Sequence, residues 1–131
     1  MPVNSNLVLC STNQLVLSAP TIYALELTPL CNNRCVGCFN VFSPELSFVA
    51  QPASPLLTAA AWEQIFQKIT PHAQAIKLTG GEPTLHPQFE QIVTALSHYN
   101  VEFAVLSNGR WRHPQRLVEF LSGQPLFRGF L

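Results

Sequence analysis

The chain has 131 residues, which allows one domain at most, since domains run at roughly 100–200 residues. Charged residues make up 11% of the chain, far below the roughly 25% of an average soluble domain, and seven Lys and Arg balance seven acidic residues, all of them Glu. This zero net charge argues against electrostatic capture of nucleic acid or of an anionic membrane, because both require a clustered excess of positive charge.

The first third of the chain predicts a hairpin, a strand and a long loop. Residues 7–10 and 15–18 are short apolar runs separated by a polar turn, and they predict an N-terminal hairpin within an extension of residues 1–19. Residues 22–28 alternate between two faces, as the first strand of the main fold would. Residues 29–57 have no periodicity and hold the clustered cysteines, so we expect a functional loop there.

Three helices are predicted in the rest of the chain from apolar residues spaced three and four apart. Thr58 is expected to cap the first helix, which Pro71 ends. Pro87 is expected at the first position of the second helix. Pro114 is expected to open the third helix and Gly123 to close it.

Strands are predicted between these helices, at residues 75–79 and 102–107, and a further strand starts at residues 126–131. Strands that alternate with helices imply βαβ units on a parallel sheet. The spacing of about 25 residues from strand to strand fits a (β/α) barrel. We therefore predict an α/β fold in which residues 20–131 form a partial TIM-type barrel, truncated after the start of its fourth strand.

The four cysteines are unevenly distributed. Cys31, Cys35 and Cys38 lie within eight residues, and Cys10 stands far upstream, whereas a disulfide framework would spread its cysteines more evenly. No apolar run approaches the roughly 18 residues of a membrane span, and residues 1–6 lack the positive charge of a secretory signal. We therefore expect a cytoplasmic protein, without a membrane partner, whose clustered cysteines hold a metal or a cluster.

Three closely spaced thiolates leave one coordination position open. A structural zinc site normally takes four protein ligands and a complete iron–sulfur cluster four cysteines, so three cysteines favour a cluster with one iron free for another ligand. The alternative is a zinc ion whose fourth ligand is Cys10 or a histidine such as His86.

Three unusual segments follow the first three predicted strands. They are the cysteine loop (residues 31–38), a Gly-Gly-Glu-Pro turn (residues 80–83) and a Ser-Asn-Gly loop (residues 107–109). Because the carboxyl ends of barrel strands meet at one rim, these segments are expected to lie together. Paired glycines would let the turn approach a ligand closely, and its carbonyls and Glu82 could hold an ammonium group.

The C-x3-C-x2-C spacing, the Gly-Gly-Glu-Pro turn and the Ser-Asn-Gly loop resemble the radical S-adenosylmethionine (radical SAM) superfamily, and the resemblance runs from about residue 22 to the last residue. It implies two cofactors, a [4Fe–4S] cluster and S-adenosylmethionine, whose methionine part chelates the fourth iron. It also implies an enzyme in which one electron cleaves the sulfonium to give a 5′-deoxyadenosyl radical that abstracts hydrogen from a substrate. The implied cluster ligands are Cys31, Cys35 and Cys38, and the implied S-adenosylmethionine-binding residues are Gly80, Gly81, Glu82, Pro83, Ser107 and Asn108.

Residues 27–31 and 77–87 look most like enzymes that modify ribosomal peptides, or related cofactor-maturation enzymes. The resemblance thus implies a peptide substrate and an electron donor such as flavodoxin or ferredoxin. Two alternatives are a glycyl-radical-enzyme activase and a non-catalytic zinc or iron–sulfur module. In the family the residue before the third cysteine is usually aromatic, but here it is Gly37, so adenine packing is expected to differ or to fall to Phe39 or to backbone. Substrate contacts in this fold come largely from later strands, so we expect the chain alone to be incomplete and inactive.

One pair of charges is predicted on the sheet. Glu26 and Lys77 lie on neighbouring predicted strands, on the face opposite the apolar residues that would meet the helices. We expect them to form an ion pair inside the barrel, because buried charges are normally paired.

Overall fold

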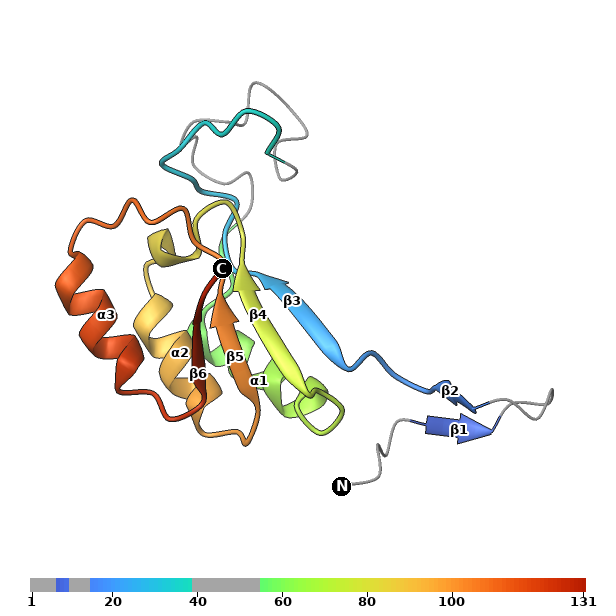
Figure 1. Cartoon of the computed structure of the whole chain (residues 1–131). Coiled ribbons are helices and arrows are strands. Elements are labelled where there is room, and N and C mark those ends of the chain that lie inside the picture. The colour runs from blue at the N-terminus through green and yellow to red at the C-terminus, as the bar shows by residue number, and fades with distance from the viewer. Residues whose placement is uncertain (1–6, 10–14, 39–54) are drawn as a thin grey trace.

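The structure is a computed structural model, and it describes residues 7–9, 15–38 and 55–131. Its main sheet has four parallel strands that follow one another in sequence order: β3 (Ile22–Glu26), β4 (Ala75–Thr79), β5 (Glu102–Val105) and β6 (Phe127–Phe130). Three helices alternate with these strands and lie on one face of the sheet (Figure 1): α1 (Ala59–Ile69), α2 (Phe89–Ser97) and α3 (Pro114–Ser122). A sheet whose strand order never reverses is wound in the manner of a barrel, which confirms the α/β, partial-barrel prediction.

The core lies between the sheet and its helices. Alternate side chains of the central strands face the helices, and Ile76, Leu78 and Val105 are completely buried. They meet the apolar stripe of α2, where Ile92 and Leu96 are also completely buried. Burying each such side chain stabilises the fold by about 1.5–3 kcal/mol. This packing fixes the position of each strand and therefore which residues lie at the carboxyl edge of the sheet.

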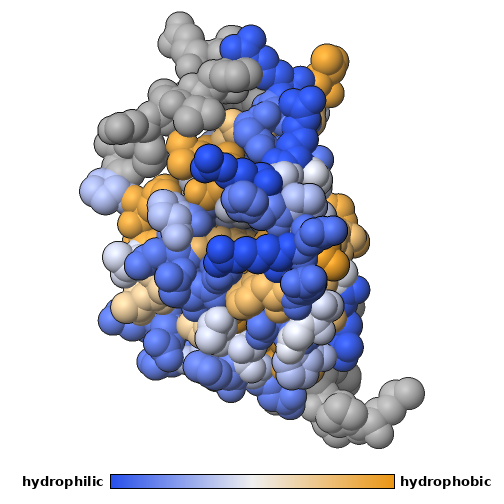
Figure 2. Space-filling model, turned by 90° about the vertical axis from the view of Figure 1, so that its left-hand side faces the viewer, coloured by the Kyte–Doolittle hydropathy of each residue, from blue (hydrophilic) through white to orange (hydrophobic). Residues whose placement is uncertain are grey.

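The ends of α1 and α3 are as predicted. The Thr58 hydroxyl caps α1 by accepting a hydrogen bond from the Ala61 N–H at 3.2 Å, and the helix ends at Thr70, immediately before Pro71. Pro114 occupies the first turn of α3, and Gly123 is its C-terminal cap. The side of the molecule that carries α3 is predominantly hydrophilic, with scattered apolar side chains (Figure 2), as expected for the outer face of an amphipathic helix.

The start of α2 differs from the prediction. The helix begins at Phe89, with Gln88 as its N-cap residue, so Pro87 precedes it rather than opening it. A short 3-10 helix, η1 (Pro83–Leu85), comes first, and the chain turns out of it at His86. The sequence pattern placed the proline correctly at a helix boundary but missed η1, which depends on contacts made by Glu82.

The predicted ion pair between Glu26 and Lys77 is wrong. In the parallel register Glu26 lies opposite Thr79, and Lys77 lies opposite Ala24, so the two charges are offset along the strands. Within the described residues neither takes part in an ion pair. Both belong to the sheet face that the helices leave uncovered, where Glu26 is exposed to solvent and needs no partner.

At the amino-terminal side, strands β1 (Leu7–Leu9) and β2 (Leu15–Leu17) pair antiparallel, with Leu7 opposite Leu17, as the hairpin prediction requires. They lie beyond the start of β3, away from the three helices (Figure 1). In the part of the chain that the structure describes, every helix is too short or too polar to cross a membrane.

Candidate functional site

The chain leaving β3 lies directly against the Gly-Gly-Glu-Pro turn that follows β4. The Gly81 N–H donates to the Thr28 carbonyl at 2.8 Å, and the Glu82 N–H donates to the Leu30 carbonyl at 2.7 Å. Cys31 follows at once. Two backbone hydrogen bonds therefore hold the base of the cysteine loop on the turn.

This close approach requires both glycines. A Cβ atom at Gly80 would overlap the carbonyl oxygen of Thr28, and one at Gly81 would overlap that of Leu30. Gly80 also has a φ of 148°, which other residues rarely adopt. The Gly-Gly pair is thus explained by the packing of one backbone segment on another.

The carboxylate of Glu82 joins the turn to the Ser-Asn-Gly loop. The residue is completely buried, and both of its oxygens accept hydrogen bonds. Thr84 donates through its hydroxyl at 2.6 Å and its N–H at 3.3 Å. The Ser107 hydroxyl lies 3.0 Å from each oxygen, and the Asn108 N–H donates at 2.8 Å. Buried carboxylates need such partners, and this one uses residues of two loops.

Ser107 is held from the other side as well. Its hydroxyl oxygen accepts hydrogen bonds from the indole N–H of Trp111 at 2.6 Å and from the Gly109 N–H at 3.2 Å. The hydroxyl proton is therefore left for Glu82. The sequence analysis did not single out Trp111 or Thr84. Their only signal in the sequence is that each carries a hydrogen-bond donor and lies next to one of the two predicted loops.

The cysteine loop contacts the Ser-Asn-Gly loop through asparagines. Cys31, Cys35 and Cys38 are free thiols, of which Cys35 is exposed and the other two are half-buried. The side-chain amide of Asn108 lies 3.6 Å from the Cys31 sulfur and donates to the Asn32 side-chain oxygen at 2.9 Å. All three predicted segments thus meet at the carboxyl edge of the sheet.

Two further features of this loop bear on the predicted ligands. The side-chain amide of Asn33 donates to the Cys35 sulfur at 3.2 Å. Gly37 has a φ of 76°, a conformation in which an aromatic residue would be strained, which accounts physically for a glycine before the third cysteine. Phe39 and Cys10 lie outside the described residues.

The donor chemistry of the loop fits an iron–sulfur cluster, because three free thiols lie on one short segment and amide N–H groups already point at two of the sulfurs. Within residues 7–9, 15–38 and 55–131, no three His, Cys, Asp or Glu side chains are grouped so as to hold a single metal ion. His86 is committed elsewhere, since its ring nitrogens pair with the Leu57 carbonyl and the Gln88 N–H, each at 3.0 Å.

These two bonds predict a pH dependence for folding. Nδ1 of His86 accepts from Gln88, so Nε2 carries the proton and the buried ring is neutral. Burial lowers the pKa of His86 below its ordinary 6.5, although the bond to Leu57 works in the opposite direction. The unfolded chain therefore binds a proton first as the pH falls through about 6.5, and stability should decrease from there downward. Urea titrations from pH 7.5 to pH 5 should show this decrease, and a smaller one in H86Q; equal slopes would contradict the assignment.

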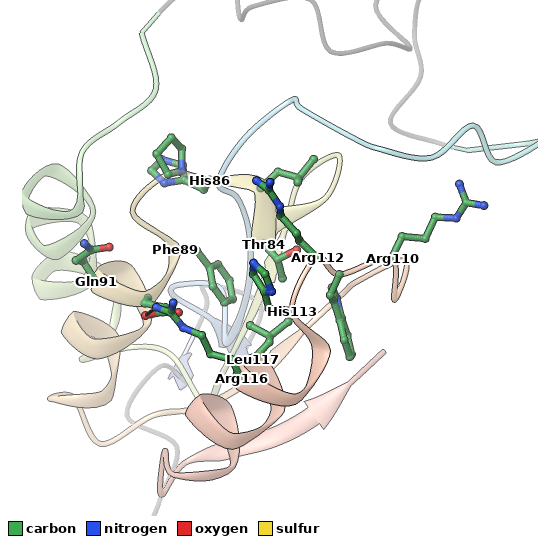
Figure 3. Close-up of a pocket in the computed structure, with 13 residues that line it drawn as sticks. Thr84, His86, Phe89, Gln91, Arg110, Arg112, His113, Arg116 and Leu117 are labelled. Carbon is green, nitrogen blue, oxygen red and sulfur yellow. Dashed lines mark hydrogen bonds and ion pairs between the residues drawn. The ribbon is translucent and has the colours of Figure 1, made fainter.

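A pocket of about 350 Å³ lies beside the site, between the start of α2 and the loop that enters α3 (Figure 3). Arg110, Arg112 and Arg116 border it, and Arg116 forms an exposed ion pair with Glu90 at 3.0 Å. The Arg110 carbonyl accepts a hydrogen bond from the Asn32 side chain at 2.7 Å. The wall of this positively charged pocket is therefore connected to the cysteine loop.

The family model described as "Radical SAM superfamily" matches residues 25–128, which include all three predicted segments. The chain belongs to the radical SAM superfamily. This confirms the family inferred from the cysteine spacing and the two loops. Members of this superfamily are enzymes, and the match runs from the end of β3 to the middle of β6.

Relatives of this radical SAM chain include proteins of two kinds. It is 33% identical over 105 residues to the sporulation killing factor maturation protein SkfB of Bacillus subtilis. The aligned segment covers 79% of this chain and 23% of SkfB. It is 30% identical over 91 residues to GTP 3′,8-cyclase of Campylobacter jejuni subsp. doylei, covering 65% of this chain and 26% of the cyclase. The chain thus spans about a quarter of the length of these curated relatives.

Solved structures show the same fold. The radical SAM chain resembles Streptococcus suis SuiB bound to precursor peptide SuiA with a TM-score of 0.71 at 18% identity, over 87% of this chain and 24% of SuiB. The structure of SuiB bound to S-adenosylmethionine gives a TM-score of 0.67 at 20% identity, over 87% of this chain and 23% of SuiB. At these identities the likeness concerns the fold.

Proposed function

We propose that this chain forms the cluster- and cofactor-binding part of a radical SAM enzyme that acts in peptide maturation. Cys31, Cys35 and Cys38 would hold a [4Fe–4S] cluster, and the Gly-Gly-Glu-Pro turn and Ser-Asn-Gly loop would hold S-adenosylmethionine. When bound, these groups supply a one-electron cleavage of the sulfonium that yields a radical for hydrogen abstraction. A flavodoxin or ferredoxin would supply the electron. The relatives SkfB and SuiB support a peptide substrate.

The observation that carries the proposal is the hydrogen-bonded convergence of the three loops in a chain of this family. Free thiols, a glycine turn and a polar loop meet at the carboxyl edge of a parallel sheet, which is where enzymes of this architecture bind their ligands. Substrate would approach the sheet face that the helices leave uncovered in the described residues.

The Gly81 carbonyl is a backbone acceptor suited to the ammonium group of S-adenosylmethionine. The Glu82 and Pro83 carbonyls already accept hydrogen bonds from Leu85 at 3.1 Å and His86 at 3.0 Å. The Gly81 carbonyl accepts none from the residues that the structure describes. Because the Glu82 carboxylate is occupied by Thr84 and the Ser-Asn-Gly loop, we assign the ammonium contact to the Gly81 carbonyl and a positioning role to the Glu82 side chain.

Anaerobic reconstitution with iron and sulfide tests the cluster. The wild-type chain should gain iron, sulfide and a broad visible charge-transfer band. C35A should lose nearly all of the band, because Cys35 is one of three ligands, whereas C10A should keep it. Stoichiometric zinc in place of iron and sulfide would contradict the proposal in favour of a zinc module, and loss of the band in C10A would show that the ligand set is wrong.

The activase alternative makes a different demand. An activase acts on a partner enzyme. If the protein is an activase, the purified chain with its cluster should therefore bind S-adenosylmethionine but have no affinity for short precursor-type peptides. Binding of a short precursor-type peptide to the reconstituted protein would favour the maturase.

A further inference from the structure

Asn108 occupies a central position between the two halves of the site. Its backbone N–H donates to the Glu82 carboxylate at 2.8 Å, and its side-chain oxygen accepts from the Arg110 N–H at 2.8 Å. Its side-chain amide nitrogen lies 2.9 Å from the Asn32 oxygen and 3.6 Å from the Cys31 sulfur. The residue is thus held at its backbone and at both ends of its side-chain amide.

These contacts form one continuous path. Glu82 is completely buried and belongs to the turn whose N–H groups hold Thr28 and Leu30, so its carboxylate is fixed by the fold. The carboxylate holds the Asn108 backbone, and the Asn108 side chain reaches the sulfur of Cys31. The cysteine loop is also held by the Glu82 N–H, which donates to the Leu30 carbonyl, and by the Asn32 side chain, which donates to the Arg110 carbonyl. Asn108 differs from these contacts because its side-chain amide reaches the Cys31 sulfur itself.

We propose that Asn108 is a positioning residue that holds Cys31 relative to the Gly-Gly-Glu-Pro turn and, by directing its amide N–H at the sulfur, makes the bound cluster easier to reduce. This inference rests on the proposed function. An N–H group that points at a ligand sulfur stabilises the additional negative charge of the reduced cluster, so it raises the reduction potential. The role differs from a direct contact with S-adenosylmethionine, which the resemblance implies for the same residue.

The test uses the reconstituted chain of 131 residues and measures the midpoint potential of its cluster by spectroscopic redox titration, without S-adenosylmethionine. N108D keeps the side-chain volume and replaces the N–H donor by a carboxylate oxygen. Its cluster should therefore titrate at a more negative potential than the wild type, and N108L should show a smaller shift in the same direction. If N108D does not fold, N108S provides the comparison, because its hydroxyl is too short to reach the sulfur.

Two matched controls separate this role from general charge effects. N100D adds the same charge at an exposed position at the opposite end of β5 and should leave the potential unchanged. N33L removes the amide N–H that contacts the exposed Cys35 sulfur, so it should also make the potential more negative. Because this contact has no link to Glu82, N33L should reduce the iron that the chain binds by less than N108L does.

The outcomes distinguish the inference from the proposed function. A wild-type chain that assembles no cluster would contradict the proposed function and with it this role. A wild-type cluster whose potential is the same in N108D would contradict the role of Asn108 alone. If N108D instead weakens S-adenosylmethionine binding, measured by equilibrium dialysis, at unchanged potential, Asn108 is a cofactor contact and the proposal is overturned.

Discussion

Replacing Gly81 by alanine should destabilise the chain by about 3 kcal/mol, because the new methyl group would overlap backbone atoms that cannot rotate away. The nearest atoms would be the carbonyl oxygens of Leu30 and Pro29. Relief requires the segment after β3 to separate from the turn, which would break the hydrogen bonds from Gly81 to Thr28 and from Glu82 to Leu30. Urea unfolding of the wild type and of G81A measures the difference directly.

Two alanine substitutions serve as controls for G81A. Gly109 has a φ of 73° but nothing near its Cβ position, so G109A should cost only the backbone strain, about 1 kcal/mol. Gly123 has an ordinary helical conformation, and G123A should be neutral or slightly stabilising. If all three variants unfold at the same urea concentration, the close approach of the turn to the β3 segment is not what the glycines provide.

Replacing Glu82 by glutamine should cost about 2 kcal/mol. The substitution keeps the volume of the side chain, but its NH₂ group would face donors where the carboxylate oxygens accept from Ser107 and Asn108. Ser107 cannot easily reverse its role, since its oxygen already accepts from Trp111 and Gly109. Equilibrium unfolding in urea gives the free-energy change.

A double-mutant cycle shows whether this loss comes from the bridge between the two loops. S107A removes the hydroxyl that contacts both carboxylate oxygens, so E82Q should cost less in the S107A background, by about 1 kcal/mol. Strict additivity of the two changes would mean that Glu82 acts through Thr84 and the Asn108 N–H rather than through the Ser107 hydroxyl.

Much of the fold was predictable because it depends on local patterns. The apolar spacing of α1 and α2, the Thr58 cap and the alternation in β4 are properties of short segments, and they hold in the structure. The convergence of the cysteine loop with residues 80–83 and 107–109 was predictable for a topological reason, since parallel strands end at one edge. The division into residues 1–19 and 20–131 and the roles of the site residues stay predictions.

The errors share a physical cause. Pro87 was placed inside α2 because the pattern cannot show η1, which Glu82 caps through its contact with the Thr84 N–H. The Glu26–Lys77 pair was expected because alternation gives the face of a residue but not its offset along the neighbouring strand. His86, named above as a possible zinc ligand, instead accepts from the Gln88 N–H ahead of α2 and contacts the carbonyl of Leu57, which lies 29 residues earlier in the sequence.

The sequence by itself determined the family, the alternation of strands and helices and the three thiols, because spacing along the chain is sufficient for each of these. Only the tertiary structure shows what the polar groups of the site contact. It shows the Glu82 carboxylate as a buried bridge between two loops and the Asn108 side-chain amide directed at the Cys31 sulfur. Such roles depend on which donors meet a carboxylate or a sulfur across more than twenty residues of chain, and no local pattern encodes that meeting.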